Sequence, residues 1–171
     1  MQEGLFSFHW RFALSSPSLS WFLGPKAKNE DLLSALITAA LQSHVEWRRG
    51  FHPEDQSPIP ADEKELLPFK RSVAKLKTDF ASLLDQLQGS VPIFSGRYNG
   101  HMLSEQTIAA QAAYFAAMLY NPNNVSLEVS PVTTRLEVEV AHQLAEMIGY
   151  DPDRSWGHLT SGGTLANFEA L

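Results

Sequence analysis

The sequence contains no cysteine among its 171 residues, so disulfides and thiolate metal sites are excluded. It has no apolar run of the roughly 20 residues that a membrane-spanning helix needs. Positive charge is scarce: 13 Lys and Arg stand against 19 Asp and Glu, a formal net charge of −6. Nucleic-acid binding requires a basic face, so this balance argues against a nucleic-acid partner.

Motifs of several functional classes are also missing. The sequence has no G-x-x-x-x-G-K-[ST] phosphate loop, no G-x-G-x-x-G dinucleotide fingerprint and no G-x-S-x-G nucleophile turn. Its six histidines are scattered without an i, i+4 pair, so we expect no metal site. Glu3 stands where a secretory signal peptide requires positive charge, and we therefore expect a cytoplasmic protein.

The first half of the chain reads mainly as helix. Apolar periodicity predicts one helix over 29–50, with Asn29 as N-cap, and a second helical region over 61–88, interrupted near Pro68. Residues 5–14 instead alternate between aromatic and small or polar side chains, which predicts a strand with an aromatic face. Such a face requires a cover, either this chain's own core or a partner subunit.

The middle of the chain combines a polar loop with two further helices. Residues 91–103 have no regular period, and such loops often carry function, although composition alone favours a plain connector. Ser104 is the expected N-cap of a helix over 105–119 that is apolar nearly all round and should be buried on most sides. Ser130 and Pro131 predict the start of the next helix, which Gly149 should end.

The last 16 residues read as a strand, a glycine turn and the beginning of a helix. Trp156, His158 and Thr160 alternate with smaller or apolar residues, as in a strand. Gly162 and Gly163 break this pattern, because glycine accepts positive φ and lets another group approach the backbone. Residues 164–171 then suit a helix.

A helix N-terminus that follows two glycines is a possible anion site. Its first N–H groups lack acceptors and carry partial positive charge, and phosphate is a common guest. Amides of Gly162 and Gly163 would be accessible, and the Thr164 hydroxyl could add a hydrogen bond. A tight turn without any ligand is about equally compatible with two glycines alone.

Four runs of the second half stand out in order and spacing: RYNGHM at 97–102, LYNPNN at 119–124, SPVTTRLE at 130–137 and WGHLTSGGTLAN at 156–167. Together they resemble the group II pyridoxal-phosphate-dependent amino-acid decarboxylases, which include the glutamate, aromatic-amino-acid and tyrosine enzymes. These runs are most similar to the tyrosine decarboxylase branch. Residues 1–96 carry only a general likeness to the helical N-terminal segment of that family.

The resemblance implies an α/β parent of PLP-dependent fold type I, of which this segment is mostly α-helical with one or two short strands. Residues 1–96 would be a helical dimerisation arm, and residues 97–171 the incomplete start of the large cofactor-binding domain. The implied assembly is a homodimer in which residues 1–50 pack largely on the partner subunit.

The resemblance also implies the site residues. The phosphate of pyridoxal 5'-phosphate would bind at Gly162, Gly163 and Thr164. His101 would contact the amino-acid substrate, with Tyr98 and Asn99 beside it. The family's Schiff-base lysine has no match among the six lysines of this sequence, so no catalytic residue is expected here. The chain therefore reads as the front part of a longer enzyme, whether as a fragment, a truncated form or half of a split protein.

The function that we expect from the sequence is that of an N-terminal part of an L-amino-acid decarboxylase, most similar to tyrosine or other aromatic enzymes. A glutamate or aspartate decarboxylase is an alternative, because these branches share the motifs. Another fold-type-I enzyme could keep the same phosphate site. An alternative from a different class is a non-catalytic helical dimerisation protein derived from such an enzyme.

Overall fold

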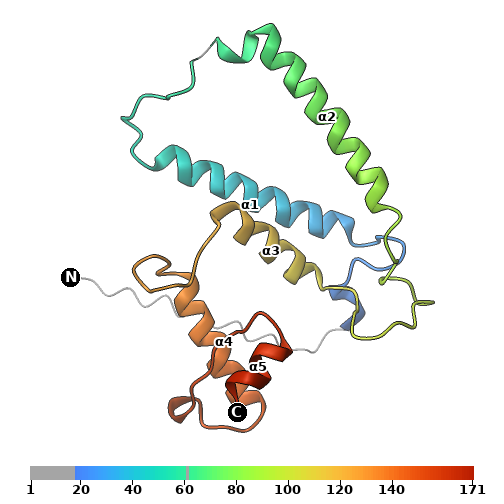
Figure 1. Ribbon diagram of the computed structural model, residues 1–171, viewed down its shortest axis with the longest axis vertical. Helices are drawn as coiled ribbons and strands as arrows, with labels where there is room; N and C mark the ends of the chain where they lie inside the picture. Colours follow the sequence, from blue (N-terminus) through green and yellow to red (C-terminus); the bar gives the residue numbers. More distant parts are fainter. Residues whose placement is uncertain (1–17, 61) are drawn as a thin grey trace. The chain divides into compact units, whose positions relative to one another are not determined.

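Residues 18–60 and 62–171 are described here from a computed structural model (Figure 1). Within these ranges the chain forms five α-helices and three short 3-10 helices, and it has no β-strand beyond one isolated bridge between Phe22 and Thr107. The chain divides into two compact units, Met1–Ala116 and Ala117–Leu171. The predicted aromatic strand at 5–14 lies outside the described residues.

The first long helix, α1, spans Glu30–Gly50 and confirms the helix predicted over 29–50. Asn29 precedes it, but its side chain does not cap the helix. The Asn29 Nδ2 group instead donates to the carbonyl oxygens of Phe22 at 2.7 Å and Ser20 at 3.3 Å. The predicted capping role is therefore wrong, because these preceding carbonyls take the amide group and tie the start of α1 to the turn before it.

The second long helix, α2, spans Leu67–Leu87, after a 3-10 helix at Glu63–Glu65. Leu66 is extended (ψ 133°) between the 3-10 helix and α2, so the predicted interruption of the helical region near Pro68 is confirmed. Pro68 itself lies in the first turn of α2. Proline is tolerated there because the first N–H groups of a helix have no intrahelical acceptor. In Figure 1, α1 and α2 run as two long rods joined by residues 51–66.

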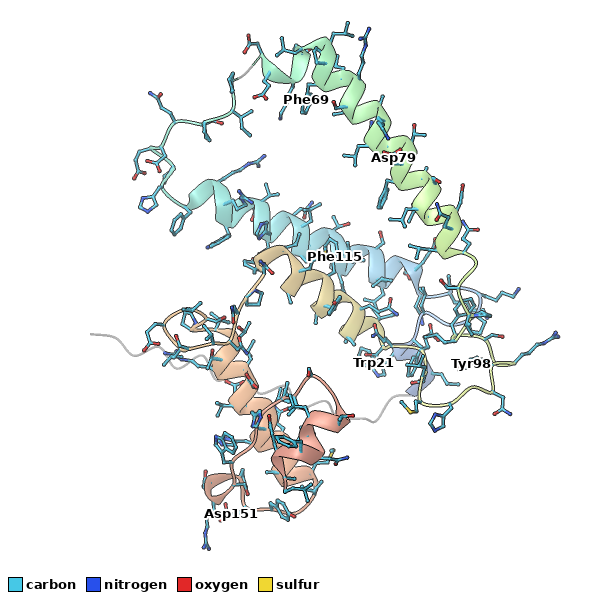
Figure 2. The ribbon with its side chains drawn as sticks, in the orientation of Figure 1. Trp21, Phe69, Asp79, Tyr98, Phe115 and Asp151 are labelled. Carbon is cyan, nitrogen blue, oxygen red and sulfur yellow. The ribbon has the colours of Figure 1, made fainter. Side chains whose placement is uncertain are left out.

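The apolar side of α2 remains uncovered within the described chain. Phe69 is 41% exposed, Phe80 56% and Leu76 66%. Figure 2 shows the side chains along this helix, with Phe69 near its start and Asp79 further along. A stripe of large apolar side chains on the surface indicates a missing neighbour.

Helix α3 spans Ile108–Tyr120 and begins three residues later than predicted. Its cap is Thr107, whose Oγ1 accepts from the Ala110 N–H at 3.2 Å, so the assignment of this role to Ser104 is wrong. Ile108 is only 1% exposed, whereas Tyr114 is 80% exposed. The expectation of burial on most sides therefore fails for this chain, because the described residues cover the start of the helix and not its outer side.

The second unit contains α4, at Thr133–Met147, and α5, at Gly163–Glu169, with a 3-10 helix at Pro152–Arg154 between them (Figure 1). Helix α4 starts two residues after Pro131. The predicted stop at Gly149 is confirmed: its φ is +88°, and Tyr150 N–H donates back to the Ala145 carbonyl at 2.8 Å. This reversal satisfies carbonyls at the end of the helix.

The segment 156–160 is not a strand in the described structure, contrary to the prediction. A strand requires a hydrogen-bonded neighbour, and an alternating sequence cannot provide one by itself. The predicted helix after the glycines is confirmed, although α5 begins at Gly163 and ends at Glu169. Side chains of the helices, described below, hold the 156–160 segment instead of a sheet.

Gly149 provides a test of the second unit. We expect Gly149→Ala to destabilise this unit by about 1–2 kcal/mol, because an L-residue is strained at positive φ. Gly50→Ala, at the end of α1, should be neutral or stabilising by up to about 1 kcal/mol. Chemical denaturation of both variants measures the difference. Equal stability of the two variants would contradict the left-handed assignment at Gly149.

Candidate functional site

The glycine turn differs from its predicted backbone conformation. Gly162 has φ 167° and ψ 166°, an extended conformation that any residue adopts, and Gly163 is the first residue of α5. The expectation that these glycines serve a positive φ is therefore wrong for Gly162. Both glycines border unoccupied space: a Cβ atom added at either glycine would meet no heavy atom within 4 Å. The turn thus faces open space within this chain.

The start of α5 has donors available at this turn. Gly162, the residue before the helix, has no side chain that could cap the first N–H groups. The first N–H groups of any helix lack intrahelical acceptors, so the amides of Gly163 and Thr164 are suited to an external anion. Thr160 Oγ1 donates to the Gly162 carbonyl at 3.1 Å and fixes the other side of the turn. The turn therefore presents amides outward while its carbonyl side is occupied.

A chain of polar side chains connects α4 to the segment that leads into this turn. The hydroxyls of Ser130 and Thr133 are 2.6 Å apart, and Thr133 Oγ1 donates to Asn124 Oδ1. Asn124 Nδ2 donates to Glu137 Oε2 at 2.9 Å. The other carboxylate oxygen, Glu137 Oε1, accepts from the Leu159 N–H at 3.0 Å. We call these five residues the Glu137 network.

The direction of donation along the Glu137 network follows from its chemistry. An ionised carboxylate only accepts, so Asn124 must present its NH₂ group to Glu137 and its carbonyl oxygen to Thr133. Thr133 then uses its single hydroxyl proton on Asn124. Because that proton is used, the Ser130 hydroxyl must donate to Thr133. Every donor therefore points toward one negative charge, and Ser130 itself is buried.

These hydrogen bonds lower the pKa of Glu137. The Leu159 N–H has the largest effect, followed by the Asn124 amide; the nearby His158 adds a smaller effect in the same direction, and partial desolvation opposes them. Each of these donors favours the charged carboxylate. Glu137 is therefore ionised at neutral pH and stays ionised below the usual range of a glutamate.

A second contact fixes the residue next to Leu159. His158 Nε2 lies 2.7 Å from Glu169 Oε2 on α5. The Trp156 and His158 rings lie 5.0 Å apart between centroids, tilted by 44°. Both side chains of the ion pair are more than one third exposed, so the pair contributes less than about 1 kcal/mol. Successive residues of the segment are thus attached to α5 and to α4.

The Glu137 network joins three of the four runs that carry the resemblance. Asn124 belongs to 119–124; Ser130, Thr133 and Glu137 belong to 130–137; Leu159 belongs to 156–167. Sequence reasoning did not single out any of these side chains as site residues. Their shared presence in the motif runs was the available signal, but only the folded chain shows that they contact one another.

The predicted substrate residues lie in the first unit, on the loop between α2 and α3, where Figure 2 marks Tyr98. Tyr98 is half-buried, whereas Asn99 and His101 are exposed. The Tyr98 ring lies against Gly100: a Cβ there would come within 2.0 Å of the ring. The structure therefore brings Tyr98, Asn99 and His101 together on one loop, and the glycine turn belongs to the other unit.

A cavity of about 620 Å³ lies near this loop within the first unit. It is lined mainly by residues 19–29, together with Phe94, Gly96, Ser104 and Glu105. Glu105 accepts from the Gly24 N–H at 2.8 Å and thereby holds two sides of the cavity together. Sequence reasoning did not find this cavity, because its walls come from segments that lie 81 residues apart at Gly24 and Glu105.

Two further features are absent from the described ranges. Residues 18–60 and 62–171 contain no group of three or more histidine or acidic residues placed to hold a metal ion. In the same residues, no helix has the length and apolar character that crossing a bilayer demands.

No protein-family model matches the chain. Individual relatives are more specific. The chain is 40% identical over 152 residues to an L-tyrosine decarboxylase of Levilactobacillus brevis. It is 36% identical to an L-tyrosine decarboxylase of Enterococcus faecalis and 35% identical to one of Enterococcus faecium. Each alignment covers 88% of this chain, and the chain spans only 24% of the length of each relative.

The lowered pKa of Glu137 predicts a pH dependence for the contact with Leu159. A depressed folded-state pKa contributes stability above the unfolded pKa, about 4.3 for glutamate, and this contribution is lost as pH falls through the folded-state value. We expect the Leu159 amide resonance to shift only below about pH 4.3, and to be flat above it. An NMR titration of the full chain measures this. A midpoint above the ordinary glutamate value would contradict it.

Proposed function

We propose that this chain corresponds to the N-terminal part of a pyridoxal-phosphate-dependent L-tyrosine decarboxylase. The observation that carries the proposal is identity of 35–40% to three relatives, all of them L-tyrosine decarboxylases. The share of 24% of each relative supports the interpretation as a part of such an enzyme. The names of these relatives favour tyrosine over glutamate or aspartate as substrate.

The glycine turn is the proposed position of the cofactor phosphate. The amides of Gly163 and Thr164 and the Thr164 hydroxyl would bind the phosphate oxygens, as at other helix N-termini. The turn fits this group, because a Cβ at Gly163 meets nothing in this chain and the space beside the amides is open. When bound, pyridoxal phosphate takes up the electron pair that remains on the substrate as carbon dioxide departs.

The loop of the first unit is the proposed substrate wall. His101 is exposed and would contact the amino-acid substrate, with Asn99 beside it. Tyr98 packs over Gly100 and would stiffen the loop from within. The interpretation of this loop as a plain connector predicts no effect of these side chains on substrate affinity.

A homodimer is the proposed assembly. Large apolar side chains on α1, α2 and α3 are exposed, including Leu41 at 47%, Phe80 at 56% and Met118 at 60%. Each such side chain contributes roughly 1.5–3 kcal/mol when buried, which is large beside a domain's net stability of about 5–15 kcal/mol. A second copy of the chain would cover these side chains. We also propose a cytoplasmic location, as a separate point. A non-catalytic dimerisation protein would share this surface but would not bind the cofactor.

The first test concerns the cofactor. We expect Gly163→Val to weaken pyridoxal-phosphate affinity about 10- to 100-fold. The branched side chain would crowd the phosphate away from the amides, and losing a charge-assisted hydrogen bond costs about 1.5–3 kcal/mol. The measurement is a titration of the full-length decarboxylase that carries this sequence. Gly96→Val, whose Cβ also meets nothing within 4 Å, is the matched control and should bind normally. Wild-type affinity in Gly163→Val would exclude the proposed phosphate site.

The second test concerns assembly. We expect the 171-residue chain to self-associate at micromolar concentration, with the exposed apolar stripe of α2 in the contact. Replacing Phe80 and Leu84 of this stripe with glutamate should shift the chain toward monomer, whereas the matched change of Ser82 should not. Analytical ultracentrifugation measures this. A compact monomer of the wild-type chain would rule out the proposed dimer surface.

A further inference from the structure

We propose that Glu137 is a positioning residue for the glycine turn: its carboxylate, held on α4, sets the path of residues 159–162 into that turn. The inference rests on the proposed function in one respect, namely that the turn holds the cofactor phosphate. Neither the names of the relatives nor the sequence motifs assign this task to Glu137. The first observation is the pair of hydrogen bonds that Glu137 accepts, from Leu159 and Asn124.

The path from Glu137 to the turn is short. Leu159 precedes Gly162 by three residues, which reach at most about 10 Å. Within this stretch, Thr160 Oγ1 bonds to the Gly162 carbonyl at 3.1 Å, so the segment cannot swing freely between its two attachments. Moving Leu159 therefore moves the amides of Gly163 and Thr164. Glu137 acts through this backbone and has no need to touch the phosphate.

The segment has no sheet neighbour in the described residues, which makes the Glu137 attachment important. In a β-sheet, the backbone N–H of an extended segment bonds to an adjacent strand. Here the Leu159 N–H bonds to a side chain of a helix instead. The same segment is attached at His158 by Glu169, but that pair joins it to α5, which moves together with the turn. The Glu137 hydrogen bond, by contrast, joins the segment to α4.

The chemistry requires a carboxylate in this position. Both oxygens of Glu137 accept, one from a backbone N–H and one from an NH₂ group. A glutamine has one acceptor and one donor group, so it can keep Leu159 only if the Asn124 amide turns over. Thr133 and Ser130 would then reverse their hydroxyls. Glu137→Gln is therefore expected to retain part of the function, and Glu137→Ala to lose it.

The charged groups around Glu137 support this assignment. His158 from the 156–160 segment lies close enough to favour the ionised form of Glu137, and the Glu169 carboxylate on α5 contacts Nε2 of the same imidazole. Glu139 lies two residues further along α4, on the exposed surface. Because it carries the same charge on the same helix, Glu139 provides a matched control.

The experiment measures amide hydrogen–deuterium exchange and cofactor affinity in the full-length protein. Mass spectrometry with fragmentation gives exchange at Leu159 and Gly163 for wild type, Glu137→Ala, Glu137→Gln and Glu139→Ala. We expect Glu137→Ala to speed exchange at Leu159 about 10-fold or more, through loss of a bond to a charged acceptor. Pyridoxal-phosphate affinity should fall in parallel, Glu137→Gln should restore part of both, and Glu139→Ala should match wild type.

Each result decides a separate question. Unchanged exchange at Leu159 in Glu137→Ala overturns the inference. Faster exchange at Leu159 with unchanged exchange at Gly163 and unchanged cofactor affinity also overturns it, because Glu137 would then be only a local support. If wild type binds no pyridoxal phosphate, the proposed function fails. Exchange at Gly163 then decides the positioning role alone. Should Glu137→Ala not fold, the comparison of Glu137→Gln with Glu139→Gln replaces it.

Discussion

The second unit depends on one hydrogen bond: a carboxylate on a helix accepts a backbone N–H that no strand of the described residues accepts. In a complete sheet, the segment before the glycine turn would be held by a ladder of hydrogen bonds. Here Glu137 accepts the Leu159 N–H at 3.0 Å and the Asn124 amide at 2.9 Å. Because an ionised group terminates the network, the hydroxyls behind it can point in one direction only. The hydrogen bond from Leu159 to Glu137 therefore ties the segment before the turn to α4.

The first unit has the opposite character, because its helices are well formed and poorly covered. Helices α1 and α2 follow their apolar periodicity closely, yet their large side chains lie on the surface. In the described residues, the buried apolar side chains are Ile108 and Ala145 alone. Local sequence thus determines these helices, and the described residues leave much of their apolar sides uncovered.

Sequence reasoning succeeded where the determinant was local and failed where it was distant. Periodicity located α1, α2 and α5, and the glycine at 149 ended its helix as expected. Asn29 and Ser104 were misassigned, because each choice depended on a competing nearby group: two carbonyls or Thr107. The strand at 156–160 failed because a strand needs a hydrogen-bonded neighbour, and the described residues provide none for this segment. Glu137 was missed because 22 residues separate it from Leu159.

The proposed substrate loop and the glycine turn therefore have different physical origins. The loop with Tyr98, Asn99 and His101 is shaped by its own sequence, since Tyr98 folds over Gly100. The glycine turn is shaped by a side chain on another helix. A change in the loop should act locally, whereas a change in the Glu137 network should displace the amides that face the open space at Gly163. An anion site built in this way is positioned by charge as well as by backbone, because the ionised carboxylate accepts from Leu159 and Asn124 at the same time.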